Sequence, residues 1–475
     1  MSNIEIPYYY ELRSYQEPAW EYMQGPEEGK RAVCVWHRRA GKDLFAINLI
    51  AAKAMQRIGT YWHVLPTYRQ GRMVVWNGMT RDGRRFLDAF PPEIVESVHN
   101  NEMRVRLKNG SVYQVMGSDE PDSLVGGNPI GVVMSEYSIQ DPRAYDRIRP
   151  MLTENGGWAM FIFTPRSRNW GWKLFTKAQR KNSGWFHDIR KAGSGDDCTK
   201  RDSTVWKKTF NGEFVPEKEN GGPVVSDEQI DQDRSDGMSE EMIDQDYKVS
   251  FESSNEGTYY GKQMAKLAKE NRLTNVPYDP KLPVNTYWDI GVGDSTAIVF
   301  AQLYGLEIRI IDYYENSGEG LAHYIRVMKE KDYLYGSHFA PWDIEVTEFS
   351  SGKTRLESAR KLGVKFKVTQ KHEIEDGIEQ VRSILPRCWI DVEKCDRLIN
   401  ALMAYAKEPL ALKFQQNADE DGGKKVFKDT PIHSWASHPA DAIRYMAWNI
   451  KYKSPYEEKK QHRAEDASDL AMPTW

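Results

Sequence analysis

The stretch VCVWHRRAGKDLFAIN, residues 33–48, contains residues that could bind a phosphate group. Its Gly41-Lys42 pair lies between an apolar β-type run and the start of a helical pattern, as in loops of the form GxxxxGK[ST]. In such loops, backbone N–H groups ahead of a helix surround a phosphate, and the lysine adds a positive charge. Two positions depart from that form, because Trp36 replaces the first glycine and Asp43 replaces the hydroxyl residue that ligates magnesium. Taken alone, the stretch also fits a helix start with a chance Gly-Lys pair.

The run IGVVMSEYS supplies the partner motif of a nucleotide site. Residues 132–134 predict a buried strand, and Ser135-Glu136 follow where Asp-Glu is usual. The usual site holds magnesium with a hydroxyl from the loop and a carboxylate from the strand, whereas here Asp43 puts the carboxylate on the loop. We therefore hypothesise that Asp43 ligates the metal directly or through water, that Ser135 completes the metal shell, and that Glu136 activates the attacking water. Two compensating changes at the correct positions favour a real nucleotide site over chance.

Other segments contain residues that could contact ATP. Tyr15 and Gln16 could stack on and hydrogen-bond an adenine, although an amphipathic N-terminal helix explains them equally well. Thr164 ends the run FIFTP, where a hydroxyl could sense the γ-phosphate, and the planar guanidinium of Arg38 suits a phosphate oxygen. The predicted ATP-binding residues are Tyr15, Gln16, Arg38, Arg39, Ala40, Gly41, Lys42, Asp43 and Thr164, with Glu136 as the catalytic carboxylate and Asp43 and Ser135 as metal ligands.

Three acidic residues in the C-terminal part indicate metal-dependent chemistry. Asp289 lies inside the apolar run TYWDIGVG, where a buried carboxylate is costly unless it binds a metal or a partner. Asp343 follows another short apolar run, and Asp441 lies in the helical pattern SHPADAIRYMAW. Three such residues suit a centre in which two Mg²⁺ or Mn²⁺ ions clamp the attacking and the leaving oxygen of a phosphodiester. Each residue alone fits a turn or a helix cap, and HPAD could simply begin a helix, but the combination favours a nuclease.

The elements that must position these residues are α/β in type. Between residues 31 and 164, apolar runs alternate with helical patterns, which predicts βαβ units and a mostly parallel sheet covered on both faces. Residues 177–255 are polar, and the acidic stretch 226–246 predicts solvated helices. From residue 287 onward, apolar runs separated by glycine-containing turns predict a meander, followed by helices and two short strands. The runs expected to form strands in the first region are AVCVW, YWHVLP, MVVWNGM, SVYQVMG, IGVVMSE and AMFIFTP, and LFAINLIAAKAM is expected to be helical.

Length and composition agree with this organisation. The length of 475 residues predicts two domains of ordinary size. From the motifs and the shifts in composition we expect a P-loop ATPase core over 1–176, a linker subdomain completing it over 177–275, a second α/β domain over 276–455 and a disordered tail over 456–475. The net charge of −4 means that any nucleic acid must be bound by local basic clusters. Four cysteines without a CxxC pair fit a reducing cytosol, and we interpret Cys388 and Cys395 as buried thiols. We expect a protein that is not secreted and does not enter a membrane.

In their order along the chain, these motifs resemble the large terminase subunit of tailed bacteriophages. The residues that carry the resemblance are RRAGKD, VVMSEY, a strand ending in TP, an acidic linker, WDIGVGDSTA and HPADAIRY, over roughly residues 12–452. The resemblance implies an additional-strand, RecA-like ATPase that drives double-stranded DNA into a procapsid, joined to a ribonuclease-H-like nuclease that cuts concatemeric DNA. It implies ATP as a cofactor, with Mg²⁺, or Mn²⁺ at the nuclease. The residues so implied are Arg38, Lys42, Asp43 and Glu136 for hydrolysis, Thr164 for coupling, and Asp289, Asp343 and Asp441 for the nuclease metals.

The resemblance also implies partners and a location. Those partners are double-stranded DNA, the small terminase subunit and the portal protein, on which identical subunits would form a ring. The expected location is the host cytoplasm, with transient docking on the procapsid. Candidate DNA contacts are the basic clusters Arg81, Arg84 and Arg85; Arg104, Arg106 and Lys108; and Arg166 and Arg168, each of which also fits a solvated face.

Two alternatives stay open at the level of sequence. A helicase-like DNA translocase with an accessory nuclease would share the loop, but it needs a second RecA-like domain with an arginine finger. An assembly scaffold would bind nucleotide without turning it over. The segment DPRAYDRIRP after Glu136 offers arginines that could reach the ATP of a neighbouring subunit, although a salt-bridged helix surface explains them as well.

Overall fold

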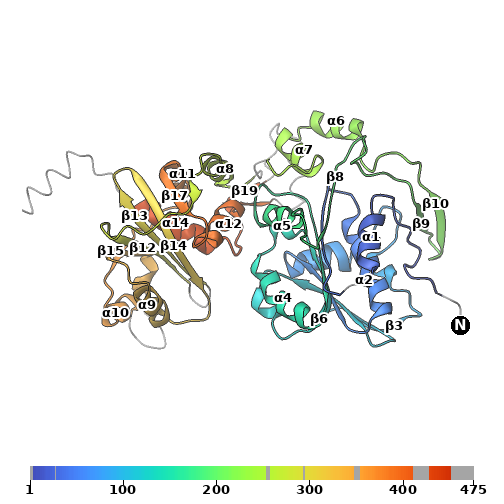
Figure 1. Ribbon diagram of the computed structural model, residues 1–475, viewed down its shortest axis with the longest axis horizontal. Helices are drawn as coiled ribbons and strands as arrows, with labels where there is room; N and C mark the ends of the chain where they lie inside the picture. Colours follow the sequence, from blue (N-terminus) through green and yellow to red (C-terminus); the bar gives the residue numbers. More distant parts are fainter. Residues whose placement is uncertain are drawn as a thin grey trace, which may run out of the picture. The chain divides into compact units, whose positions relative to one another are not determined.

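A computed structural model of the chain describes residues 4–26, 28–252, 257–291, 295–346, 354–409 and 427–450. The chain divides into two compact units, residues 1–261 and 262–475, each with a sheet of its own (Figure 1). The linker subdomain stays a prediction, and the predicted C-terminal tail lies outside the described residues.

An eight-stranded, mostly parallel sheet forms the frame of the first unit, in the order β3-β4-β5-β2-β6-β7-β1-β8. Strands β1 (Arg31–Trp36) and β6 (Pro129–Ser135) are not neighbours, because β7 (Trp158–Phe163) lies between them and pairs in parallel with both. This inserted strand is the feature of the additional-strand, RecA-like class that the resemblance implied. The other strands are β2 (Thr60–Leu65), β3 (Val95–His99), β4 (Arg104–Leu107), β5 (Val112–Gly117) and β8 (Phe186–Arg190), of which β4 pairs antiparallel with β3 and β5.

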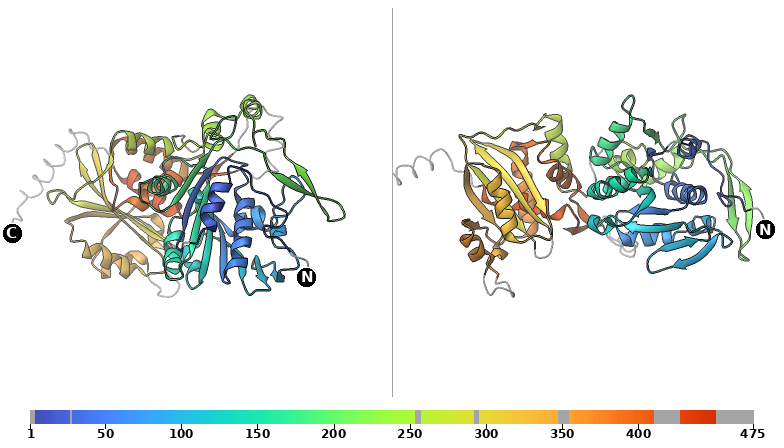
Figure 2. Two further views of the ribbon diagram at one scale, coloured as in Figure 1. Left: turned by 45° about the vertical axis from the view of Figure 1, so that its right-hand side comes forward. Right: turned by 60° about the horizontal axis from the view of Figure 1, so that its bottom comes forward.

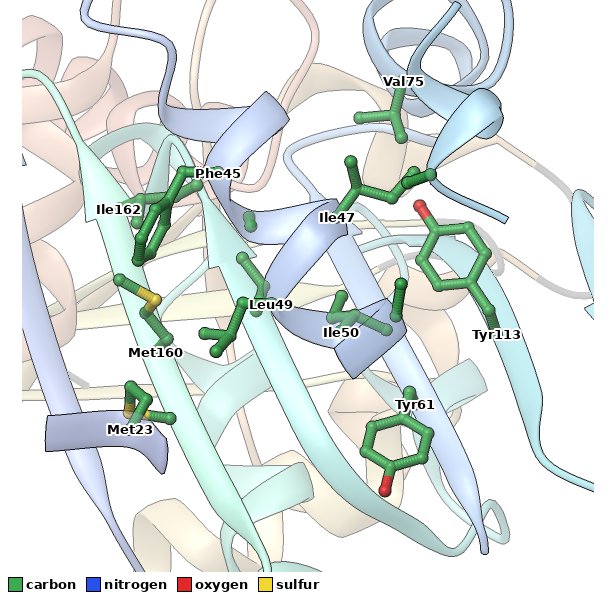
Figure 3. Close-up of a cluster of buried hydrophobic side chains, with 14 of the residues drawn as sticks. Met23, Phe45, Ile47, Leu49, Ile50, Tyr61, Val75, Tyr113, Met160 and Ile162 are labelled. Atoms are coloured by element: carbon green, nitrogen blue, oxygen red, sulfur yellow. The ribbon is translucent and has the colours of Figure 1, made fainter. Parts of the chain in front are cut away.

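Helices cover both faces of this sheet (Figure 1, Figure 2). Helices α1 (Glu17–Gln24) and α2 (Lys42–Gln56) lie on one face, and α4 (Arg143–Glu154) and α5 (Trp170–Ala178) lie on the other. Phe45 and Leu49 of α2 pack with Met160 and Ile162 of β7 in one buried cluster (Figure 3). Strands that are buried on both faces are apolar throughout, which explains why the continuous runs of the sequence predicted them.

One of the predicted strands is helical instead. The first four residues of the run MVVWNGM lie in the π-helical turn η1 (Arg72–Trp76), which directly follows helix α3 (Tyr68–Gly71), so the prediction of a strand there is wrong. The hydroxyl of Thr67 accepts a hydrogen bond from the backbone N–H of Gln70 and starts the helix. Periodicity alone does not distinguish a short apolar strand from a buried helical segment of the same length.

The remaining elements of the first unit are short helices and one hairpin. As predicted, the acidic stretch 226–246 is helical. These elements are η2 (Phe86–Ala89), η3 (Pro121–Leu124), η4 (Tyr137–Ile139), the hairpin β9 (Thr204–Lys208) and β10 (Phe214–Lys218), α6 (Asp227–Ser235) and α7 (Glu240–Asp246).

The second unit contains a seven-stranded sheet in the order β11-β17-β14-β13-β12-β15-β16. Strands β12 (Val284–Ile290), β13 (Thr296–Tyr304) and β14 (Glu307–Asn316) form the predicted antiparallel meander. Strand β15 (Tyr335–Ala340) then pairs in parallel with β12, and β16 (Phe366–Val368) pairs with β15. A three-stranded antiparallel meander whose first strand pairs in parallel with the next strand of the chain is the ribonuclease-H-like arrangement that the resemblance implied. The other strands are β11 (Leu273–Thr274), β17 (Cys388–Asp391), β18 (Lys407–Pro409) and β19 (Phe427–Pro431).

Helices also cover both faces of the second sheet (Figure 2). On one face, α9 (Leu321–Glu330) and α10 (Arg355–Lys361) enclose a core that includes Trp288. Helix α14 (Ser437–Asn449) packs against β12 and β13 on the other face, and the buried Cys388 and Cys395 agree with their predicted state. The other elements are α8 (Gly261–Lys269), η5 (Trp342–Glu345), α11 (Ile374–Ile384), η6 (Leu385–Arg387) and α12 (Asp396–Ala404).

Candidate nucleotide and nuclease sites

The loop between β1 and α2 has the backbone of a phosphate-binding turn. Arg39 and Gly41 adopt left-handed conformations, with φ of 74° and 73°, and α2 begins directly after Gly41. The unpaired N–H groups at the start of that helix therefore border the loop. Trp36 is fully buried as the last residue of β1, and its ring packs edge-on against Tyr15 and Phe45. The indole that replaces the usual glycine thus lies in the core and does not fill the loop.

Lys42 links the ends of β1, β6 and β7. Its buried Nζ donates a hydrogen bond to Thr164 Oγ1 at 2.9 Å and contacts the carbonyl oxygens of Trp36 and His37 at 3.2 Å each. Glu136 Oε1 lies 3.5 Å from the same nitrogen, and Glu136 Oε2 accepts from the backbone N–H of Thr164 at 3.4 Å. The side chain of Glu136 is 31% exposed, so water can reach its carboxylate. Three predicted site residues therefore form one cluster at the carboxyl edge of the sheet.

Asp43 and Ser135 are in direct contact, as an exchange of roles between them requires. Ser135 Oγ donates a hydrogen bond to Asp43 Oδ1 at 2.5 Å. His63, which the sequence analysis did not assign, contributes a second contact to Oδ1, with its Nε2 at 3.3 Å. The position of His63, a polar residue in the middle of the apolar run YWHVLP, could have indicated a role in the site.

The environment of Asp43 keeps its carboxylate charged. Burial alone would raise the pKa of Asp43, but the hydrogen bonds from His63 and Ser135 and the charge of Lys42 outweigh burial and hold the pKa below its usual value. An ionised carboxylate at the head of α2 suits both a metal ion and the helix N-terminus.

A pocket beside the loop is lined by the N-terminal segment, Gly41, the turn at residues 80–84 and the start of β9. Gln16 lines it, and its Oε1 accepts hydrogen bonds from the hydroxyl of Tyr10 at 2.8 Å and the backbone N–H of Arg13 at 3.2 Å. Tyr15 does not face this pocket, contrary to the expected stacking role. Its ring is 4% exposed, and its hydroxyl donates to the carbonyl of Ala40 at 2.6 Å, so Tyr15 supports the loop from beneath. The aromatic side chains that do line the pocket are Tyr9, Tyr10 and Trp206.

Arg38 connects the loop to the end of α7. Its Nη1 lies 3.0 Å from Oδ2 of the buried Asp246, and its backbone N–H donates to the carbonyl of Asp246 at 2.8 Å. The side chain of Arg38 is nevertheless 62% exposed, so its guanidinium lies at the surface of the loop. The neighbouring Arg39 is exposed and Ala40 is buried.

Several of the other arginines that the sequence suggested are paired within the chain. Arg84 is buried and donates to the carbonyls of Tyr8 and Tyr9, so it supports the N-terminal segment and does not present a surface to DNA. The arginines after Glu136 form the salt bridges Arg143–Asp141 at 2.9 Å, Arg147–Asp122 at 2.8 Å and Arg149–Asp146 at 3.2 Å.

The carboxylates of the second unit come from two parallel strand ends and a helix. Asp289 is the next-to-last residue of β12, and Asp343 lies in η5 directly after the parallel neighbour β15. Successive strand residues face opposite sides, so Asp289 faces away from the α9 core that holds Trp288. Asp441 comes from α14, which packs on β12. Electrostatic coupling joins the set, because the charge of Asp289 raises the pKa of both Asp343 and Asp441 in addition to the effect of burial.

Two of these carboxylates are bound to cationic or titratable side chains of α14. His438 Nδ1 lies 2.9 Å from Asp289 Oδ2, and this hydrogen bond raises the pKa of His438. Arg444 Nη1 lies 2.9 Å from Asp441 Oδ1. Burial nevertheless raises the pKa of Asp441, to about 7. His438 lies in the motif HPADAIRY but was not among the predicted site residues.

A divalent cation fits the chemistry of this group. Asp343 Oδ1 is buried and has no hydrogen-bond partner among the described residues, and a raised carboxyl pKa signals uncompensated negative charge that a cation would neutralise. No three His, Cys, Asp or Glu side chains in the described part of the chain form a preformed metal cage. Like charges repel each other, and here the carboxylate of Asp289 contacts His438 while the carboxylate of Asp441 contacts Arg444. Metal binding would therefore require these two carboxylates to turn back.

Parts of the sequence are similar to known large terminase subunits. No protein-family model matches the sequence. The large terminase subunit of Thermus virus P23-45 is 24% identical over 187 residues, which cover 36% of this chain and 38% of that protein. The large terminase subunit of Escherichia phage T5 is 25% identical over 151 residues, which cover 31% and 33%. The chain is thus similar in sequence to large terminase subunits of phages. The resemblance predicted from the sequence is thereby confirmed, although the matched stretches span about a third of each of these relatives.

Solved terminases show likenesses at lower identity. The large terminase of a thermophilic bacteriophage in complex with ADP is 15% identical, with a TM-score of 0.38 over 93% of this chain and 100% of that one. The P22 large terminase nuclease domain is 14% identical, with a TM-score of 0.29 over 38% of this chain and 88% of that one. Within the part of this chain that the structure describes, every helix is too short or too polar to cross a membrane.

Proposed function

We propose that this chain is the large subunit of a viral DNA-packaging motor. It hydrolyses ATP to move double-stranded DNA into a procapsid, and it cuts concatemeric DNA with a metal-dependent nuclease. The observation that carries the proposal is the cluster of Lys42, Glu136 and Thr164 at the carboxyl edge of an additional-strand sheet, in one chain with three coupled carboxylates on a ribonuclease-H-like sheet.

ATP hydrolysis follows from the contacts of Lys42. Before nucleotide binds, the ammonium of Lys42 neutralises Glu136 at 3.5 Å. Phosphate oxygens would draw Lys42 away, which leaves Glu136 unpaired and able to act as a base. Glu136 then takes a proton from a water whose oxygen attacks the γ-phosphorus, and the bond from that phosphorus to the bridging oxygen breaks to release ADP and phosphate.

Other residues of the nucleotide site bind or report on the nucleotide. Asp43 and Ser135 would hold Mg²⁺, which when bound neutralises charge on the phosphoryl oxygens. Thr164 contacts both Lys42 and Glu136, so it senses whether the γ-phosphate is present and passes this state to the end of β7. The Gln16 pocket would receive the base, and Arg38 would approach the phosphates from the surface.

Nuclease activity would depend on Asp289, Asp343 and Asp441. They would hold Mg²⁺ or Mn²⁺, which when bound activates water and stabilises the leaving oxygen of the DNA strand. His438 orients Asp289 through its hydrogen bond. We further propose, from the relationship to terminases alone, that the small terminase subunit and the portal protein are partners and that the chain acts as a ring in the host cytoplasm.

The alternatives are less well supported. A helicase-like translocase needs a second RecA-like domain, whereas the second sheet here contains an antiparallel meander. A scaffold without ATP turnover gives no reason for a base-like carboxylate that is accessible to water beside a buried lysine. ATP turnover that depends on Glu136 would exclude the scaffold.

Separating the two activities by mutation tests the proposal. Lys42→Ala and Glu136→Gln should each abolish ATP hydrolysis and DNA translocation and leave the nicking of plasmid DNA intact, whereas Asp289→Asn should do the reverse. Asp312→Asn is the matched control, because Asp312 is a buried carboxylate on the same sheet that is paired with Lys331. This variant should lose stability but still cut DNA. Nicking by Asp289→Asn at the wild-type rate would refute the nuclease assignment.

A further inference from the structure

Four side chains form a continuous hydrogen-bonded row beneath the phosphate loop. The hydroxyl of Tyr113 lies 3.3 Å from His63 Nδ1, His63 Nε2 lies 3.3 Å from Asp43 Oδ1, and Ser135 Oγ lies 2.5 Å from the same oxygen. Tyr113, His63 and Ser135 come from the adjacent strands β5, β2 and β6 and are all fully buried. Figure 3 shows Tyr113 on the face covered by α2, beside Ile47.

The chemistry of the groups fixes the direction of the hydrogen bonds. An ionised carboxylate only accepts, so the imidazole nitrogen that faces Asp43 must carry a proton, and in a neutral imidazole the other nitrogen accepts. Burial, together with the charge of Asp43, raises the pKa of Tyr113 well above its usual value, so the phenol keeps its proton and donates to His63 Nδ1. The hydrogens of Tyr113, His63 and Ser135 therefore all point toward Asp43.

The row uses only one of the two carboxylate oxygens of Asp43. Both donors bind Oδ1, and within the described residues no hydrogen bond to Oδ2 is found. The side chain of Asp43 is 16% exposed although its neighbours are fully buried. Oδ1 is thus bound on the protein side, and Oδ2 is left for a ligand.

We infer that His63 and Tyr113 are positioning residues that hold Asp43 Oδ1 and thereby aim Oδ2 at the metal ion that accompanies the nucleotide. The inference rests on the proposed ATPase function and adds two residues that lie outside the loop and strand motifs. A hydroxyl residue at position 43 would need no such support. A partly buried carboxylate does, because an unpaired charge in an apolar environment is far more costly than an unpaired hydroxyl.

Manganese binding in the presence of ADP tests the inference without relying on turnover. Titrating the full-length protein with Mn²⁺, with and without ADP, and detecting free Mn²⁺ by electron paramagnetic resonance isolates the ADP-dependent site from the nuclease site. His63→Leu should weaken ADP-dependent Mn²⁺ binding about tenfold, the effect of one lost hydrogen bond to a charged group. His63→Gln, whose amide N–H can replace Nε2, should recover most of that loss. Tyr113→Phe, which acts one step further away, should weaken binding about threefold.

Tyr61→Phe is the matched control for Tyr113→Phe. Tyr61 is buried on the same strand as His63, but its hydroxyl donates to the carbonyls of Lys53 and Arg57, away from Asp43. Its removal should lower stability and leave Mn²⁺ affinity unchanged. ATP turnover is a second readout. We expect the turnover of the His63→Leu variant to recover as the Mg²⁺ concentration is raised.

The outcomes separate the inference from the function on which it rests. A wild-type protein with no ADP-dependent Mn²⁺ binding contradicts the proposed ATPase site itself. Wild-type affinity in folded His63→Leu, or equal effects of Tyr113→Phe and Tyr61→Phe, overturns the positioning role alone. If His63→Leu does not fold, the comparison of the two tyrosine variants decides.

Discussion

Exchanging the side chains of Asp43 and Ser135 is expected to preserve ATP turnover better than changing either one alone. The two residues touch through a 2.5 Å hydrogen bond, and together they provide one hydroxyl and one carboxylate. Asp43→Ser leaves two hydroxyls and no charge. Ser135→Asp puts a second carboxylate in a fully buried position beside the first, and like charges disfavour each other's ionised form. The double variant restores one hydroxyl and one carboxylate in the usual order.

The expected magnitudes follow from this contact. A hydrogen bond to a charged group contributes about 1.5–3 kcal/mol, so each single variant should lose about 2.5 kcal/mol of transition-state stabilisation, or roughly 70-fold in turnover. If the losses added, the double variant would lose about 5 kcal/mol, or roughly 5000-fold. Residues in contact couple by up to about 3 kcal/mol. The double variant should therefore turn over about 30-fold more slowly than the wild type and faster than either single variant.

Steady-state ATP hydrolysis across a magnesium series measures this coupling. A damaged metal shell should shift the magnesium dependence of the single variants before it removes hydrolysis, and the double variant should shift back toward the wild type. A double variant no faster than the slower single variant would refute the exchange. Asp43 would then act only as a negative charge at the N-terminus of α2.

Three further outcomes are expected. Tyr15→Phe removes the hydrogen bond to the Ala40 carbonyl and should lower the free energy of unfolding by about 1–2 kcal/mol, measurable by urea denaturation, while the KM for ATP rises. Burial and the charge of Asp289 raise the pKa of Asp441 in the folded state from its usual 3.8 to about 7. Between these two pH values the folded state binds more protons than the unfolded state, so stability falls as the pH rises through this range. In EDTA, Asp441→Asn should therefore melt above the wild type at pH 8 but not at pH 4, and equal melting at both would contradict the shift. Mn²⁺ should raise the melting temperature of the wild type at pH 8 and raise that of Asp289→Asn much less, in a thermal shift measurement that includes excess EDTA as the control.

The parts of the sites that the sequence predicted are those determined by strand ends. Parallel strands place their carboxyl ends at one edge of a sheet, and ligands bind at that edge. Lys42, Glu136 and Thr164 each follow an apolar run and accordingly lie within one cluster. Asp289 and Asp343 were recognisable in the same way, because β12 and β15 are parallel neighbours.

The parts that the sequence did not predict depend on contacts between strands and on the direction of side chains. His63 reaches Asp43 only because β2 lies beside β6 and beneath the start of α2, and no local pattern encodes that adjacency. From the sequence, Tyr15 could equally face a base or the core. In the structure it is buried, and its hydroxyl donates to the carbonyl of Ala40. His438 reaches Asp289 from a helix that is distant in sequence. The helix in place of the MVVWNGM strand began with a side-chain cap that hydrophobic periodicity does not report.

The dependence of His63 on the charge at position 43 leads to a final prediction. In the wild type, His63→Leu leaves a buried carboxylate oxygen with one donor instead of two. In an Asp43→Ser background, the same substitution replaces a histidine that no longer faces a charge. We therefore expect His63→Leu to lower turnover about tenfold in the wild type and only slightly in the Asp43→Ser background, a coupling of about 1.4 kcal/mol between residues in contact. If His63→Leu reduces turnover equally in both backgrounds, His63 supports the packing of β2 against α2, and the carboxylate is held by Ser135 alone.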